Sequence, residues 1–228
     1  MKYIILFLVA ASTVGQSYAQ AQWSPDDSLS YALGQDLGAY MKRMDIPVNK
    51  EHLIKAISDV LDDQKTVFES EEKDQIIRAG MQRIQEERNA SLKQAAEDFM
   101  QANLSNPDIR STPEGVQYEV LQKGSGEKAN LSDTVVVHYI GKLASGETFD
   151  NSYDRGDPLS LTMETVIEGW KIGIPLMELG SKYRFFIPYN LGYGTRGSGP
   201  IPPYSALIFE VELLNIKKAE NQSEENAI

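Results

Sequence analysis

The hydrophobic pattern of this chain changes its period once, near Pro113, and the change divides the sequence into two parts. Over residues 24–105, apolar residues recur at spacings of three and four, which is the pattern of one face of an α-helix. After Pro113 they alternate with polar residues at a spacing of two, which is the pattern of half-buried β-strands. We therefore expect an α+β protein with a helical N-terminal part and a sheet-forming C-terminal part.

Two short helices open the first part. Ser24 is a typical N-cap residue, Pro25 suits the first helical position, and Pro47 ends the first helix. Asn49 can cap the second helix. The first apolar face holds Leu29, Ala32, Leu33, Leu37, Tyr40, Met41 and Met44, and the second holds Leu53, Ile54, Ile57, Val60 and Leu61.

A third helical pattern runs over residues 70–105, from Ser70 to the stop at Asn106-Pro107. Its second half is rich in Lys, Glu, Gln and Ala, with few apolar residues. A helix of that length extends ~50 Å, which is long for a compact domain. The pattern predicts a connecting helix that acts as a spacer.

The segment 22–69 carries many Leu, Ile and Met residues for its size. A unit this small buries its core poorly alone, and association of two chains is a common remedy. The composition favours a helical dimerisation domain, and hence a homodimer. A small monomeric helical subdomain packed on the rest of the chain is the alternative.

The second part, residues 112–218, predicts a compact antiparallel sheet wrapped around one short helix. The helix fits Glu168 to Ile174, before Pro175. The last residues, 219–228, are polar and are expected to be a disordered tail. The expected strands are Gln117 to Leu121, Val135 to Leu143, Leu159 to Met163, Lys182 to Ile187 and Ala206 to Ile216.

Residues 1–21 have the pattern of a secretory signal peptide. Lys2 is followed by an apolar run from Ile4 to Ala11 and by small residues suited to cleavage around Ala19 and Ala21. The run is shorter than the ~20 residues of a membrane span. We expect an exported chain with no membrane span once mature, in the periplasm of a Gram-negative bacterium; outer-membrane association or secretion are alternatives.

Composition excludes several kinds of chemistry. The chain has no cysteine, which removes thiol nucleophiles, disulfides and Cys-type metal sites. Its net charge of −11 and the lack of a Lys/Arg run argue against nucleic acid as a partner. The two histidines, His52 and His138, have no metal-binding spacing, so no metal and no cofactor is expected.

Other motifs also fail as signs of catalysis. Residues 192–197 match G-x-G-x-x-G by letter, but the Pro-rich residues after them cannot form the helix that dinucleotide binding requires. No G-x-S-x-G nucleophile motif is present, and His138 is interpreted as a hydrogen-bonded structural residue. Paired carboxylates remain open, although nothing marks a partner for Asp150.

An apolar binding pocket is the stronger indication. Pro200, Pro202 and Pro203 stiffen a loop that leads into the last strand, and such a loop can form the wall of a preformed pocket. Aromatic and aliphatic residues beside Gly and Pro loops suit a concave apolar site, although most such residues belong to a core. These residues are Tyr139, Phe149, Val166, Ile167, Trp170, Tyr193, Ile201 and Phe209.

Five motifs follow one another in the C-terminal part of the chain. They are Val136-Val137-His138-Tyr139-Ile140-Gly141, Gly146-Glu147-Thr148-Phe149-Asp150-Asn151-Ser152, Val166-Ile167-Glu168-Gly169-Trp170, Leu191-Gly192-Tyr193-Gly194 and Ile201-Pro202-Pro203. With these motifs in this order, residues 115–214 resemble the FK506-binding-protein (FKBP) type of peptidyl-prolyl cis-trans isomerase. The N-terminal helices, especially Tyr31-Ala32-Leu33-Gly34-Gln35, resemble the dimerisation domain of the exported Mip/FkpA-like members.

The resemblance implies a proline pocket with Trp170 as its floor. It also implies that the Ile167 amide and the Tyr193 hydroxyl donate hydrogen bonds to substrate carbonyls, and that Asp150 shapes one rim. The implied site residues are Tyr139, Phe149, Asp150, Val166, Ile167, Trp170, Tyr193, Ile201 and Phe209.

Two departures from the family pattern affect ligand binding. Leu159 stands where many members have an aromatic wall residue, and the loop before Ile201 lacks the histidine that some members carry. These departures bear on the binding of FK506- or rapamycin-like macrolides, which the resemblance also implies, more than on isomerase activity.

Two functions remain in competition. The first is an exported, dimeric prolyl isomerase that assists the folding of proline-containing exported proteins and also acts as a chaperone. The second is a holdase-type chaperone with incidental isomerase activity. An adhesin-like surface role is a third reading that the sequence does not test.

Overall fold

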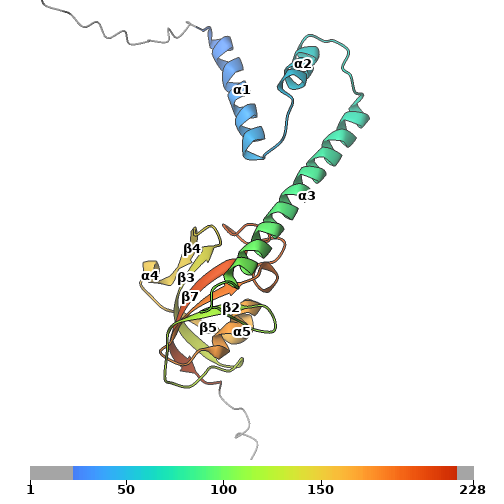
Figure 1. The fold of residues 1–228 in the computed structure, drawn as a ribbon. Helices are drawn as coiled ribbons and strands as arrows, with labels where there is room; N and C mark the ends of the chain where they lie inside the picture. The colour runs from blue at the N-terminus through green and yellow to red at the C-terminus, as the bar shows by residue number, and fades with distance from the viewer. Residues whose placement is uncertain (1–22, 220–228) are drawn as a thin grey trace, which may run out of the picture. The chain divides into compact units, whose positions relative to one another are not determined.

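The computed structural model describes residues 23–219. Contacts divide the chain into two compact units, one ending at Ile77 and the other beginning at Arg78. The signal peptide expected over residues 1–21 lies outside the described residues, as does the tail expected over 219–228 apart from Ala219. Figure 1 shows the elements of each unit.

The N-terminal unit contains α1 (Pro25–Arg43), α2 (Lys50–Leu61) and the start of α3 (Ser70–Asn103). Ser24 and Asp27 form a reciprocal capping box at the first helix. The Asn49 side chain accepts a hydrogen bond from the His52 amide at the second helix. The expected caps and the order of the three helices are therefore confirmed.

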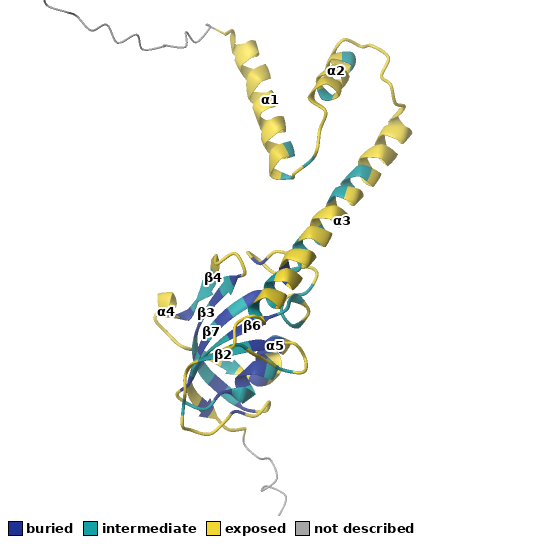
Figure 2. Cartoon of the chain, in the orientation of Figure 1, coloured by how far each residue is buried: buried dark blue, intermediate teal, exposed yellow. Residues whose placement is uncertain are grey.

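Residues 23–77 of this unit form no hydrophobic core within one chain. No residue of α1 or α2 is buried, and Figure 2 shows both helices as exposed along almost their whole length. Apolar side chains that would form a core elsewhere stay largely open to solvent. They include Leu29, Tyr31, Leu33, Ile54, Ile57, Val60, Leu61, Val67, Phe68, Ile76 and Ile77.

The C-terminal end of α3 belongs to the second unit and packs on its sheet. Ala96 is the one buried residue of the helix, and Phe99 lies 6.0 Å from Phe186, measured between ring centroids. The side-chain amide of buried Gln117 donates to the Met100 carbonyl at 2.8 Å and accepts from Asn103 at 3.0 Å. Part of the predicted spacer is thus fixed to the C-terminal unit.

The C-terminal unit is an antiparallel sheet curved around α5 (Glu168–Gly173), as Figure 1 shows. The strand order is β1-β2-β6-β7-β3-β4, with β5 paired to β3. The strands are β1 (Arg110–Ser111), β2 (Gln117–Gln122), β3 (Thr134–Leu143), β4 (Thr148–Asn151), β5 (Leu159–Thr162), β6 (Lys182–Ile187) and β7 (Leu207–Lys217).

The predicted strands and the helix are present, but three short elements were not predicted. These are β1, β4 and the single turn α4 (Ser152–Arg155). They are too short to show a hydrophobic period, and α4 directly continues β4. Three 3₁₀ turns, Met163–Thr165, Ile174–Leu176 and Tyr189–Leu191, complete the unit.

The core lies between the sheet and α5. Alternate residues of β3 and β7 are buried, which is the period-two pattern predicted from the sequence. A Cβ at Gly169 would overlap Ile187, and one at Gly173 would lie 2.8 Å from Phe185. Glycine at these two positions lets the helix approach the sheet closely enough to place Trp170 beneath the aromatic residues of β3 and β7.

Candidate active site

A cavity of about 270 Å³ opens beside α5 in the C-terminal unit. It contains every predicted site residue except Ile201, drawn from segments that are far apart in the chain. Its lining consists of Tyr139, Phe149, Asp150, Leu159, Leu161, Thr165, Val166, Ile167, Trp170, Tyr193 and Phe209.

Four aromatic rings form the base of this cavity. Trp170 is only 5% exposed and meets Tyr139 and Phe209 edge to face, at centroid distances of 5.3 and 5.2 Å. Phe149 meets Phe209 in the same manner at 5.6 Å. Edge-to-face contacts fix ring orientation, so the base is rigid and apolar.

One corner of the cavity is polar. The Tyr139 hydroxyl donates to one carboxylate oxygen of Asp150, and the Arg155 guanidinium pairs with the other. Arg155 also donates to the Tyr139 hydroxyl at 3.1 Å and lies over the tyrosine ring, 5.6 Å from its centroid. The three side chains therefore hold one another in place.

This network shifts the ionisation of its members. Burial alone would raise the pKa of Asp150, but hydrogen bonds from Tyr139 and Arg155 and the guanidinium charge lower it below the usual value. Burial, followed by the hydrogen bond to Asp150, raises the pKa of the Tyr139 hydroxyl. Asp150 is thus a fixed carboxylate at neutral pH and is poorly suited to general acid catalysis.

Two hydrogen-bond donors at the cavity have no partner among the described residues. The Ile167 amide, at the N-cap of α5, donates to no other described group, and neither does the Tyr193 hydroxyl. Burial and the nearby Asp150 charge raise the pKa of Tyr193, so its hydroxyl keeps its proton at neutral pH. Both donors are available to a ligand carbonyl.

Ile201 lies elsewhere in this structure. It is 5% exposed, belongs to the hydrophobic core, and does not line the cavity. Its backbone exchanges two hydrogen bonds of 2.9 Å with Ser198, which closes the loop tightly. The prediction that its side chain contacts substrate rests on the family pattern alone.

Three residues of this region were missed in the sequence. Leu161 follows Leu159 by two positions on β5, so the strand period placed it on the same face and was a usable signal. Thr165 lies in a short 3₁₀ turn. Arg155 reaches Asp150 only because α4 folds the chain back, and that turn leaves no periodic signal in the sequence.

Within residues 23–219, no group of three His, Cys, Asp or Glu side chains could hold a metal ion. His138 is hydrogen-bonded to Ser152 at 2.9 Å and stacked on Tyr153, as expected for a structural histidine. A curved antiparallel sheet with a rigid aromatic cavity over one short helix defines a class of protein, the FKBP-type isomerase domain.

Comparisons with known proteins agree with this class. A family model described as FKBP-type peptidyl-prolyl cis-trans isomerase matches residues 125–214. A second model, described as the domain amino terminal to FKBP-type peptidyl-prolyl isomerase, matches residues 26–120. The chain belongs to the FKBP-type peptidyl-prolyl cis-trans isomerase family, and it is an enzyme of that kind.

Relatives match nearly the whole chain. The outer membrane protein MIP of Legionella longbeachae is 33% identical, covering 93% of this chain and 98% of the relative. The FKBP-type isomerase FkpA of Escherichia coli K12 is 35% identical, covering 92% and 83%. The crystal structure of E. coli FkpA superposes with a TM-score of 0.69 at 34% identity, covering 86% of this chain and 98% of that one.

Proposed function

We propose that this isomerase assists the folding of proline-containing exported proteins, and that the cavity over Trp170 is its proline site. The observation that supports the site most strongly is the pairing of a rigid apolar base with two unpartnered donors, the Ile167 amide and the Tyr193 hydroxyl. In this proposal the proline ring rests on Trp170, and the donors bind carbonyl oxygens on either side of it.

The reaction at such a site is rotation about one bond, the peptide bond before proline. A peptide bond resists rotation by ~18–20 kcal/mol because twisting removes its resonance. The twisted amide has lost much of its charge separation, so an apolar cavity favours it over the planar ground state more than water does. A donor that bonds better to the twisted form adds to the effect. Rotation needs no acid, base or nucleophile.

A matched pair of tyrosine variants tests this site. Tyr193→Phe removes a donor from the cavity, whereas Tyr189→Phe removes a hydroxyl from a ring that packs on Tyr204 outside the lining. We expect kcat/KM for a short X-Pro peptide to fall only in Tyr193→Phe, with both variants equally stable. Equal turnover in the two variants would show that the proline site lies elsewhere.

We also propose that the chain works as a homodimer through its N-terminal helices. The support is the set of exposed apolar residues on α1 and α2, which have no core within one chain. Leu33→Glu and Ile57→Glu place charges on these faces, so sedimentation should shift from dimer to monomer. Asp36→Lys, an exposed change of charge on α1, is the control and should stay dimeric.

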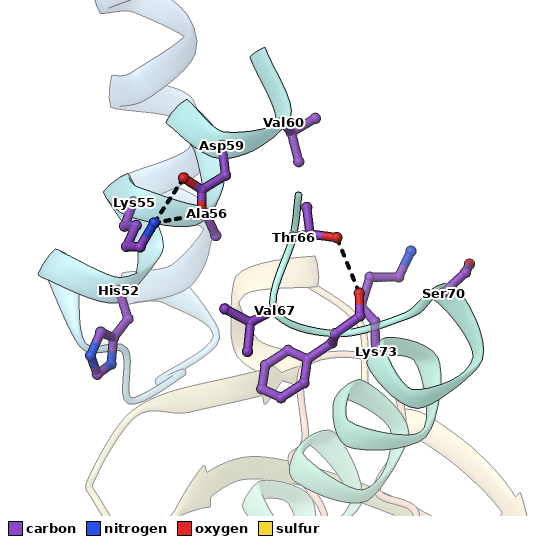
Figure 3. Close-up of a pocket in the computed structure, with 10 residues that line it drawn as sticks. His52, Lys55, Ala56, Asp59, Val60, Thr66, Val67, Ser70 and Lys73 are labelled. Carbon is purple, nitrogen blue, oxygen red and sulfur yellow. Dashed lines mark hydrogen bonds and ion pairs between the residues drawn. The ribbon is translucent and has the colours of Figure 1, made fainter. Parts of the chain in front are cut away.

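A second cavity, of about 560 Å³, lies within the N-terminal unit between α2, the 62–69 connection and the start of α3 (Figure 3). Val60, Val67 and Phe68 give it apolar walls, and Lys55 pairs with Asp59 at 2.8 Å along one side. In the proposed dimer this cavity belongs to the face covered by the second copy.

Chaperone activity forms part of the same proposal. The rival reading is a holdase whose isomerase activity is incidental. Comparing the full chain with residues 78–219 separates them, because that fragment keeps the end of α3 that packs on the sheet. Equal peptide isomerisation, with suppression of aggregation only by the full chain, would assign catalysis to one unit and client capture to the other. Suppression of aggregation by both the full chain and the fragment would show that α1 and α2 are not needed for client capture.

We infer further that residues 1–21 direct export to the periplasm. The relative named outer membrane protein MIP supports an envelope location. No helix in residues 23–219 is both long and apolar enough to span a bilayer.

The proposed domains are 22–69 for dimerisation, 70–105 for the connecting helix and 112–218 for catalysis, with 219–228 as a tail. Macrolide binding stays a weaker proposal, because both Leu159 and Leu161 line the cavity.

A further inference from the structure

Ser152 occupies an unusual place at the junction of β4 and α4. Its side chain is fully buried, and its hydroxyl oxygen lies close to three polar atoms. It accepts a hydrogen bond from the Tyr139 amide at 2.7 Å and donates to the Tyr139 carbonyl at 3.1 Å. The third atom is Nδ1 of His138, at 2.9 Å.

The register of the sheet explains these contacts. Ile140 pairs with Asn151, and Gly141 pairs with Asp150, so the next position places Ser152 opposite Tyr139. A continuing strand would satisfy both backbone groups of Tyr139 with its own backbone. Here the chain turns into α4 instead, and the serine hydroxyl takes the place of both missing ladder partners.

This replacement of ladder partners by a side chain allows the chain to leave the sheet immediately after Asn151. The turn of α4 then brings Arg155 back to two cavity-lining residues, where it pairs with Asp150 and donates to the Tyr139 hydroxyl. A strand that continued straight on would carry Arg155 away from both groups. The polar corner of the cavity therefore depends on the junction at Ser152.

The opposite side of α4 is fastened to the outer face of the sheet. Tyr153 stacks on His138 with ring centroids 4.3 Å apart, and its hydroxyl donates to Glu212 at 2.8 Å. His138 and Glu212 are themselves paired across β3 and β7. The Ser152 hydroxyl has a single proton, which it donates to the Tyr139 carbonyl. In its contact with Ser152, Nδ1 of His138 is therefore the donor.

We propose that Ser152 is a positioning residue for the isomerase reaction, acting by seating α4 so that Arg155 fixes Asp150 and Tyr139 at the cavity. Tyr153 secures the same turn from outside. This inference rests on the proposed proline site. Ser152 does not touch substrate, since it is fully buried, and it is not a nucleophile despite the neighbouring histidine.

The experiment uses the full chain and a matched serine. Ser181 is also fully buried in the same unit, but its hydroxyl has no hydrogen-bond partner among the described residues. Ser152→Ala should lower kcat/KM for an X-Pro peptide about tenfold through misplacement of the site. Amide exchange at Tyr139 should become faster in the same variant. Ser181→Ala should leave both quantities unchanged.

A double-mutant cycle separates positioning from general loosening. Arg155 is the other partner, because its side chain is about half exposed, at 46%, and its removal leaves the core intact. In an Arg155→Leu background, Ser152→Ala should lower kcat/KM by less than about twofold, because the guanidinium that α4 positions is already absent. The same loss in both backgrounds would refute the inference.

Two further variants keep the outcome decisive. If Ser152→Ala does not fold, Tyr153→Leu tests the same turn from its exposed side, with the same dependence on Arg155 expected. Tyr193→Phe reports on the proline site independently of α4. Loss of activity in Tyr193→Phe with full activity in Ser152→Ala overturns only the positioning role. Full activity in both overturns the proposed site as well.

Discussion

Replacement of Trp170 by alanine should separate the stability of the catalytic unit from its activity. Trp170 is 5% exposed, packs edge to face on Tyr139 and Phe209, and forms the base of the cavity. We expect Trp170→Ala to lower both the free energy of unfolding and kcat/KM, because one ring serves the core and the site at once.

The size of the effect follows from burial. Truncating a buried tryptophan to alanine costs about 3–5 kcal/mol, which includes the two aromatic contacts at ~0.5–1.5 kcal/mol each. A typical domain unfolds at about 5–15 kcal/mol, so the variant should still fold, with a clearly lower urea midpoint. Activity of the folded fraction should fall at least tenfold, equivalent to ~1.4 kcal/mol of transition-state stabilisation.

The assay needs a signal other than tryptophan fluorescence. The chain has only two tryptophans, so the variant retains Trp23 alone, in the N-terminal unit. Far-UV circular dichroism in urea gives stability, and a short X-Pro peptide gives kcat/KM. Trp23→Ala is the control and should match the wild type in peptide turnover. Undiminished turnover by folded Trp170→Ala would refute the assignment of the cavity floor.

Three other predictions concern stability. Gly197→Ala should cost about 1–2 kcal/mol or more, because φ is +71° and the new Cβ would overlap the Ile201 carbonyl; urea unfolding measures it. The hydrogen bond from the Asn130 backbone amide lowers the pKa of Asp133. The contribution of Asp133 to stability is therefore present above about pH 4 and is lost as pH falls. Asp133→Asn should therefore flatten the acid limb of a stability–pH curve, and an unchanged limb would contradict this. Burial raises the pKa of Tyr153 to about 12, so its contribution to stability is fully present below about pH 10 and is lost as the pH rises toward about 12; Tyr153→Phe should remove that loss.

The elements with strong periodic patterns were predictable because their signal is local. Ser24 and Asn49 cap the helices as expected, and β3 and β7 bury alternate residues as their sequences predict. The five ordered motifs around Tyr139, Phe149 and Trp170 also sufficed to identify the family. Each cap, strand and motif is recognised from residues close together in the chain.

The elements that escaped prediction are short and depend on distant partners. The turn α4 has four residues and forms where the Ser152 hydroxyl can satisfy the backbone of Tyr139, thirteen positions away. The helix α3 was itself predicted, but the packing of its end on β6, through Phe99 and Phe186, was not. No local pattern encodes such contacts, because the partner is supplied by the folded sheet.

Local residue patterns were enough to predict the architecture, the family and most of the residues that line the cavity over Trp170. The division of the predicted residues between cavity and core became visible only in the folded chain. The fold placed Leu161 and Arg155 at the cavity and turned Ile201 into the hydrophobic interior. A period-two pattern specifies which face of a strand is buried. The curvature of the sheet and the turn at Ser152 then determine which residues that face contacts.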